Sequence, residues 1–165
     1  MALPRLGRHR VCLWLFITAI LGLAGFARTT LSQDLSRLLG TWSGKGKIVF
    51  KADKAESIKC NAYNRGEGSE LRPVIRCASP SYKIEIRSKL QKVGNKLSGI
   101  WEERTYNATG TATGRITSST LSVAISGGGF RGEMDVSYTW SRQTVRITTE
   151  GFDMKSVDIS LLRSG

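Results

Sequence analysis

The chain has 165 residues, with 25 Lys and Arg against 13 Asp and Glu, and its formal net charge is +12. This length corresponds to one domain, and 40% hydrophobic residues are enough to build a core. One histidine and three cysteines leave little room for histidine-dependent catalysis or thiolate metal sites.

The first 27 residues have the pattern of a secretory signal peptide. Three arginines precede an apolar run over 11–24, and small residues follow, so we expect cleavage after Ala27. The alternative is an uncleaved membrane anchor, although the run is short for a membrane span. Cleavage removes the three arginines, the only histidine and Cys12, and lowers the net charge to +9. We therefore expect a periplasmic or secreted protein without a transmembrane segment, a catalytic residue, a metal or a cofactor.

The two cysteines that remain are Cys60 and Cys77. In an exported chain, two cysteines predict one disulfide, with two free thiols as the alternative.

Residues 28–39 form a polar lead-in, in which Asp34 could cap a short helix that Gly40 ends. Residues 40–165 are then a single β domain, because short segments alternate apolar and polar side chains between turn residues. We predict ten strands, near 41–50, 56–63, 71–77, 81–91, 96–105, 108–116, 120–126, 130–139, 144–150 and 155–163.

The turns fix how consecutive strands align, because opposed residues in an antiparallel pair share one face. Turns centred on 68–69 and 94–95 place the two cysteines opposite each other and Leu90 opposite Gly99. Turns at 127–128 and 141–142 and a loop at 151–153 give these pairs: Ile125 with Phe130, Tyr138 with Val145, and Ile147 with Val157. Each of these alignments keeps one face apolar.

One apolar face predicts an antiparallel up-and-down meander of 8–10 strands that closes into a small lipocalin-like barrel. Pro73 in the third strand predicts an edge or a bulge there. Glycines alternate with bulky residues on the core face, at Gly44, Gly46 and Gly99 among others. They either permit sharp coiling around a filled interior or leave room for a ligand, and we favour the filled barrel.

The sequence Gly40-Thr41-Trp42 after a short helical turn resembles the start of calycin barrels, a group that includes lipocalins, avidins and small bacterial barrel inhibitors. The resemblance implies that Trp42 closes the base of the barrel and packs under an arginine of the last strand, for which Arg163 is the candidate.

A second resemblance is to small uncharacterised exported proteins of alphaproteobacteria, of the rhizobial type. It is carried by residues 40–50, 76–79, 81–84, 99–105 and 125–132. It implies a periplasmic or secreted barrel and brings no known activity.

Three residues are candidates to face a ligand: Trp101, Glu103 and Tyr138. Glu103 shares its face with Trp101, and an inward carboxylate could be a polar hook at a barrel mouth. The alternative is a carboxylate at a strand end that reaches solvent or pairs with an arginine.

Lys83, Arg87 and Lys89 share an outward face and form a possible anion-binding surface, or an ordinary solvated face. We therefore expect a non-enzymatic binding or envelope-associated protein. Its partner would be a small apolar ligand or an anionic envelope component, and we do not expect nucleic acid. The alternative is a barrel-type protease inhibitor that acts through residues 28–39.

Overall fold

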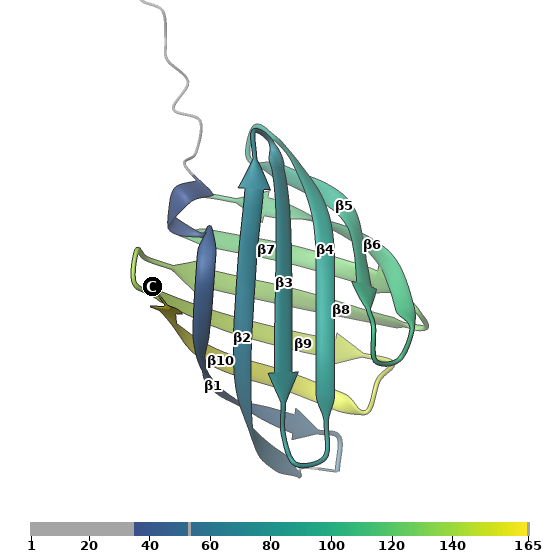
Figure 1. Cartoon of the computed structure of the whole chain (residues 1–165). Helices are drawn as coiled ribbons and strands as arrows, with labels where there is room; N and C mark the ends of the chain where they lie inside the picture. The colour runs from purple at the N-terminus through teal and green to yellow at the C-terminus, as the bar shows by residue number, and fades with distance from the viewer. Residues whose placement is uncertain (1–34, 53, 165) are drawn as a thin grey trace, which may run out of the picture. The chain divides into compact units, whose positions relative to one another are not determined.

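The computed structural model describes residues 35–52 and 54–164, which form ten antiparallel strands in a closed barrel (Figure 1). The predicted signal peptide, its cleavage site and residues 28–34 lie outside the described residues. The strands are β1 (Gly40–Phe50), β2 (Ala55–Glu67), β3 (Glu70–Ala78), β4 (Lys83–Val93), β5 (Lys96–Glu103), β6 (Ala108–Ile116), β7 (Thr120–Gly127), β8 (Phe130–Tyr138), β9 (Arg142–Glu150) and β10 (Met154–Ser164).

The predicted all-β meander and its closure are confirmed. Each strand pairs with the next, and β10 returns to pair with β1, where Trp42 lies opposite Arg163. Closure gives every strand two hydrogen-bonded neighbours, so no strand edge stays open. In Figure 1, β2, β3 and β4 cross in front of β7 to β10, as the strong coiling of a small barrel requires.

The predicted N-terminal helix is not confirmed. A single 3₁₀ turn, η1 (Leu35–Arg37), precedes β1, and no α-helix occurs within 35–52 or 54–164. The part of the lead-in that contains Asp34 lies outside the described residues.

Three of the five predicted alignments hold. Cys60 lies opposite Cys77 and forms the predicted disulfide with it, and Leu90 lies opposite Gly99. The β9–β10 pair also has the predicted register, with Ile147 opposite Val157.

The other two predicted alignments are wrong, because each is shifted by two residues along the strand, a shift that leaves the same side chains on the inner face. Ile125 lies opposite Gly132 rather than Phe130, and Tyr138 lies opposite Gln143 rather than Val145. The β7–β8 turn is centred on Gly128-Gly129, because a run of three glycines accepts the required positive φ at either position. Alternation could not separate these solutions, since a two-residue shift keeps the same face.

Pro73 does not mark an edge or a bulge, which corrects the prediction. β3 is paired on both sides, and its register with β4 does not shift. Pairing with β4 is simply interrupted at Arg72 and Pro73, where proline has no N–H to donate.

The strand glycines permit close approach of neighbouring strands. A methyl group at Gly44 would lie 1.9 Å from the carbonyl oxygen of Ser160, and one at Gly99 would lie 1.9 Å from that of Lys89. These positions are therefore filled by backbone, which supports coiling rather than space for a ligand.

Candidate functional site at the open end of the barrel

One end of the barrel is closed by side chains that converge on a single carbonyl group. The oxygen of Leu38 accepts hydrogen bonds from Trp42 Nε1 at 3.1 Å, Asn64 Nδ2 at 3.0 Å and Gln143 Nε2 at 3.2 Å. All three donors are buried and come from β1, β2 and β9. The segment before β1 is thereby held across the end of the barrel.

Arg163 completes this closure from β10. Its guanidinium lies 4.2 Å from the ring centre of Trp42 and donates to the carbonyls of Trp140, Leu39 and Arg37 at 2.6, 2.7 and 2.8 Å. Trp42 is fully buried beneath it. The cation therefore bridges the N-terminal turn, the β8–β9 loop and the tryptophan.

Tyr138 belongs to this closed end. Its hydroxyl donates to the carbonyl of Thr117 at 2.6 Å, and its ring is buried. Burial raises the pKa of Tyr138 above 10, against a smaller opposing effect of Arg37. The structure therefore separates Tyr138 from the other two ligand-facing candidates, because alternation predicts a face but not an end of the barrel.

The closed end also bears on the inhibitor alternative. Leu38 is 3% exposed, and the carbonyls of Arg37, Leu38 and Leu39 are bonded to the barrel. Residues 35–39 are therefore part of the closure, and an inhibitory arm would have to come from residues before 35.

The opposite end contains a pocket of about 140 Å³, here called the mouth pocket. Its aromatic residues pack as a chain, with ring centres of Trp101 and Phe130 5.0 Å apart, Phe130 and Phe152 5.9 Å apart, and Phe152 and Tyr106 6.0 Å apart. The lining residues are Ile84, Ile86, Trp101, Glu103, Tyr106, Ala108, Ile125, Gly128, Phe130, Ile147, Thr149, Phe152 and Met154.

The rings at this end become more exposed toward the rim. Trp101 is 3% exposed and Tyr106 is 50% exposed, with Phe130 and Phe152 between buried and exposed. Partial removal from water raises the pKa of Tyr106 above 10, and the charges of Tyr82 and Glu103 raise it further. The mouth pocket is thus an apolar funnel rather than a sealed core.

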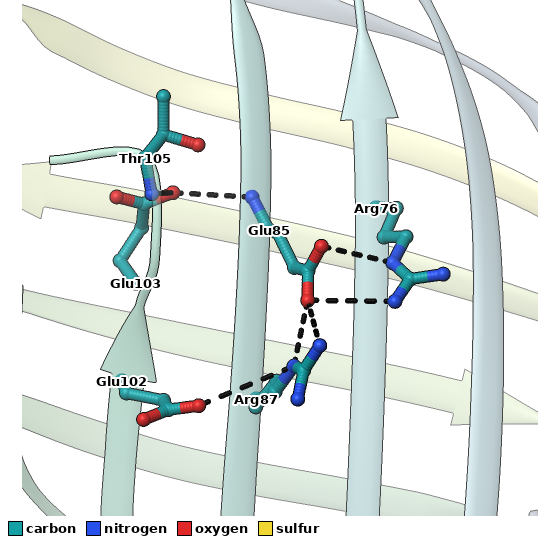
Figure 2. A network of polar contacts seen from close by, with 6 residues as sticks. All are labelled: Arg76, Glu85, Arg87, Glu102, Glu103 and Thr105. Atoms are coloured by element: carbon teal, nitrogen blue, oxygen red, sulfur yellow. Dashed lines mark hydrogen bonds and ion pairs between the residues drawn. The ribbon is translucent and has the colours of Figure 1, made fainter. Parts of the chain in front are cut away.

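Glu103 is buried in the wall of this pocket, rather than reaching solvent or pairing with an arginine as the alternative prediction for a strand-end carboxylate has it. Its Oε1 accepts the backbone N–H groups of Glu85 at 3.1 Å and Thr105 at 3.0 Å, and its Oε2 accepts that of Tyr106 at 2.6 Å. Figure 2 shows this carboxylate between β4 and the turn after β5. Glu103 therefore fixes the pocket wall while presenting a carboxylate to it.

The barrel also contains two smaller chambers. One of about 80 Å³ extends toward the closed end, and one of about 30 Å³ lies beside the mouth pocket, under the turn between β3 and β4. Ile86 and Ile147 line both chambers and the mouth pocket, so they partition the interior. The interior is therefore divided rather than hollow, and each space is smaller than the 300 Å³ or more of an ordinary ligand site.

The outward face of β4 is a mixed-charge network. Arg87 lies 2.5 Å from Glu85 and 4.0 Å from Glu102, and Lys89 lies 3.4 Å from Glu70. Figure 2 shows Glu85 between Arg76 and Arg87, and the hydrogen bonds from these two arginines hold the pKa of Glu85 below its ordinary value. Carboxylates thus offset the cations expected to bind anions, and Lys83 stands exposed at the end of the strand.

A shallow groove of about 430 Å³ crosses β4, β5 and β6 beside this network. Exposed Ile100 and the backbone at Gly110 form part of it. It is an open surface depression, and of the aromatic chain of the mouth pocket Trp101 alone lines it.

No group of three or more His, Cys, Asp or Glu side chains within 35–52 and 54–164 is placed to hold a metal ion. In the described part of the chain, no helix has the length and apolarity needed to cross a membrane.

Sequence comparisons assign no family. No family model matches the chain, and no curated protein matches it.

Two solved structures share the fold. Rv2717c from M. tuberculosis aligns over 79% of this chain and 95% of its own, with 11% identity and a TM-score of 0.67. The S-type phycobiliprotein lyase CPES from Guillardia theta aligns over 84% of this chain and 94% of its own, with 13% identity and a TM-score of 0.55. Both are calycin-like β-barrels, consistent with the resemblance noted at Gly40–Trp42, and identities this low show the fold alone.

Proposed function

We propose that this chain is an exported, non-enzymatic binding protein that takes a small apolar ligand into the mouth pocket. The observation that carries the proposal is the difference between the two ends of the barrel. At the closed end the polar side chains are hydrogen-bonded to backbone groups of the protein, whereas at the open end half-buried aromatic rings surround a pocket. Half-buried aromatic surface around a concavity is typical of ligand sites.

The volume of the pocket limits what can enter. A dry cavity of about 150 Å³ holds one benzene molecule, so about 140 Å³ accommodates one ring or a short alkyl group. A larger ligand would leave its remainder at the rim, over Phe152 and Tyr106. The calycin-like fold of a lyase named for phycobiliproteins supports a binding role in this kind of barrel.

Export is supported by the disulfide and by the sequence of the first 27 residues. The Cys60–Cys77 disulfide persists in oxidising compartments and is rare in the cytosol. Expression in an alphaproteobacterial host, followed by mass spectrometry of the periplasmic fraction, is expected to give a mature protein that begins at Arg28. Recovery of the full-length chain in the membrane fraction would refute this part of the proposal.

Ligand binding is tested with toluene as the probe and two matched substitutions. Ala108 is half-buried and lines the mouth pocket, so Ala108→Leu adds a side chain where the ring would lie. Ala124 is exposed on β7, so Ala124→Leu adds the same atoms outside the barrel. We expect saturable shifts of the mouth-pocket amide signals in an NMR titration of wild type and Ala124→Leu, and at least tenfold weaker shifts in Ala108→Leu. Equal binding by both variants would exclude the mouth pocket as the site.

A further inference from the structure

Glu103 is the only buried Asp or Glu side chain within residues 35–52 and 54–164. It is 8% exposed, and no lysine or arginine of these ranges forms an ion pair with its carboxylate. By contrast, Glu85 and Asp158 are more exposed, and each pairs with an arginine. Burying a charge is unfavourable unless the charge is paired, so the unpaired carboxylate points to a ligand that brings the missing positive charge.

Among the described residues, only backbone amides hold this carboxylate. The N–H groups of Glu85 and Thr105 donate to Oε1, and that of Tyr106 donates to Oε2. A carboxylate offers about four acceptor positions, so one is left on Oε2. The amides orient the group but carry no net charge. The negative charge of Glu103 is therefore not compensated in the wall of the mouth pocket.

The rings of the mouth pocket also suit a cation. The ring centres of Trp101 and Phe130, Phe130 and Phe152, and Phe152 and Tyr106 lie 5.0, 5.9 and 6.0 Å apart, and all four rings line the pocket. The negative face of an aromatic ring attracts a cation within about 6 Å of the ring centre, and rings this close together let one cation approach more than one of them. Within the described part of the chain, no Lys, Arg or His side chain lines the pocket.

We propose that the mouth pocket selects small organic cations, namely ammonium groups carried on a single ring or a short alkyl chain, with Glu103 as the counter-charge. This inference rests on the proposed ligand-binding function and specifies the chemical class of the ligand. The volume of about 140 Å³ restricts the buried apolar part to one ring or a short chain. Carboxylates of the same size are disfavoured, because they bring a second negative charge into apolar surroundings.

The overall charge of the protein opposes this selection, which makes the test sharper. The chain has 25 Lys and Arg against 13 Asp and Glu, so its long-range field attracts anions and repels cations. Salt screens exposed charges over about 10 Å at 0.1 M, whereas a buried pair is screened much less. A preference for cations that persists at high salt therefore comes from the pocket and not from the surface charge.

The experiment compares three probes of similar size, benzylammonium, benzyl alcohol and benzoate, in an NMR titration at high salt, with toluene as the probe of the proposed function. We expect benzylammonium to displace toluene and to bind about tenfold more tightly than benzyl alcohol, as for one hydrogen bond to a charged group. Benzoate is expected to bind more weakly than benzyl alcohol. The amide signals of Glu85, Thr105 and Tyr106 report the hydrogen bonds to Glu103, and should move more with benzylammonium than with benzyl alcohol.

Two variants and one control assign the preference to named groups. Glu103→Gln keeps the size of the side chain and removes its charge, and is expected to bring benzylammonium and benzyl alcohol within about twofold of each other. Phe152→Leu keeps an apolar side chain and removes the ring, and should weaken benzylammonium about threefold more than toluene. Glu102→Gln is the matched control, because the neighbouring carboxylate is 48% exposed on the outward face and pairs with Arg87. It should leave the preference unchanged.

The outcomes separate this inference from the function on which it rests. Binding of toluene in the mouth pocket together with equal affinities for benzylammonium, benzyl alcohol and benzoate would overturn the selection and leave the ligand-binding function intact. A preference for benzylammonium that survives Glu103→Gln would overturn the role of Glu103. No binding of any probe at the mouth would overturn both. If Glu103→Gln does not fold, the amide signals decide, because unmoved signals of Glu85, Thr105 and Tyr106 at saturating benzylammonium would exclude contact with the carboxylate.

Discussion

Replacing Arg163 by alanine should destabilise the barrel more than any exposed charge substitution. The guanidinium donates to three backbone carbonyls and lies over Trp42. Each such bond contributes about 1 kcal/mol net, and the cation–π contact about 0.5–1 kcal/mol at a partly exposed site. After allowance for partial exposure, the expected loss of unfolding free energy is about 3 kcal/mol.

The assay is urea unfolding followed by tryptophan fluorescence, with the protein kept oxidised. With a slope of about 1–3 kcal/mol/M, the midpoint should fall by roughly 1–3 M. Arg163→Lys keeps the charge without the planar fork and should lie between wild type and alanine. Arg146→Ala is the matched control, because this side chain is 67% exposed and its ion pair with Asp158 lies at the surface, so its loss should be below about 1 kcal/mol. Equal midpoints for Arg163→Ala and Arg146→Ala would refute the idea that Arg163 fastens the closed end.

Three further predictions concern the barrel. Gly44→Ala should unfold at a far lower urea concentration or fail to fold, by about 3 kcal/mol or more, because the new methyl group meets a backbone carbonyl at 1.9 Å. Reduction of the Cys60–Cys77 disulfide, whose cysteines are 17 positions apart, should lower stability by about 3 kcal/mol in the chain-entropy model, measured as the difference between oxidised and reduced protein. The folded pKa of Tyr138 is raised, so its contribution is complete below the unfolded value of 10 and is lost as pH rises through the folded value, and Tyr138→Phe should flatten this alkaline decline.

Each of these has a result that contradicts it. An alanine at position 44 that leaves the midpoint unchanged would mean that β1 and β10 lie further apart than described. A reduced protein as stable as the oxidised one would remove the disulfide from the stabilising interactions. An alkaline decline identical in Tyr138→Phe and wild type would assign that decline to other groups.

The sequence predicted the strand faces well because period-two alternation is imposed by burial on one side only. Three features followed from this alternation together with a single plausible turn position: the disulfide, the β4–β5 register and the β9–β10 register. The β7–β8 turn failed because three consecutive glycines offer two equivalent centres.

The closed end was only partly predictable. Trp42 and Arg163 could be proposed from a resemblance, but the carbonyl of Leu38 as a common acceptor could not. Asn64 and Gln143 did give a signal, because both are polar residues at inward positions of otherwise apolar faces. A buried amide at such a position requires a partner, and the partner here is a backbone group that no side-chain pattern reveals.

The mouth pocket, too, could be predicted only in part from the sequence. Parity placed Trp101 and Glu103 on one inner face, and the structure brings them into one pocket with Phe130 and Phe152. It also moved Tyr138 to the far end, because position along a barrel depends on the strand direction as well as on the face. The partition by Ile86 and Ile147 depends on side-chain packing and has no counterpart in the alternation.

The pairing of β1 with β10 also governs how the barrel can be completed. The hydroxyl groups of Ser43 on β1 and Ser164 on β10 are hydrogen-bonded although they are 121 positions apart in the sequence. The second edge of β1 can therefore form its hydrogen bonds only after the last strand is in place. Such long-range pairing is slow to form, and an incomplete barrel leaves β1 available to neighbouring chains. Lys45 and Lys47 point outward from β1 and place positive charges on this strand while its edge is unpaired. The late pairing of β1 with β10 thus exposes the folding barrel to aggregation, and the lysines of β1 oppose this aggregation by electrostatic repulsion.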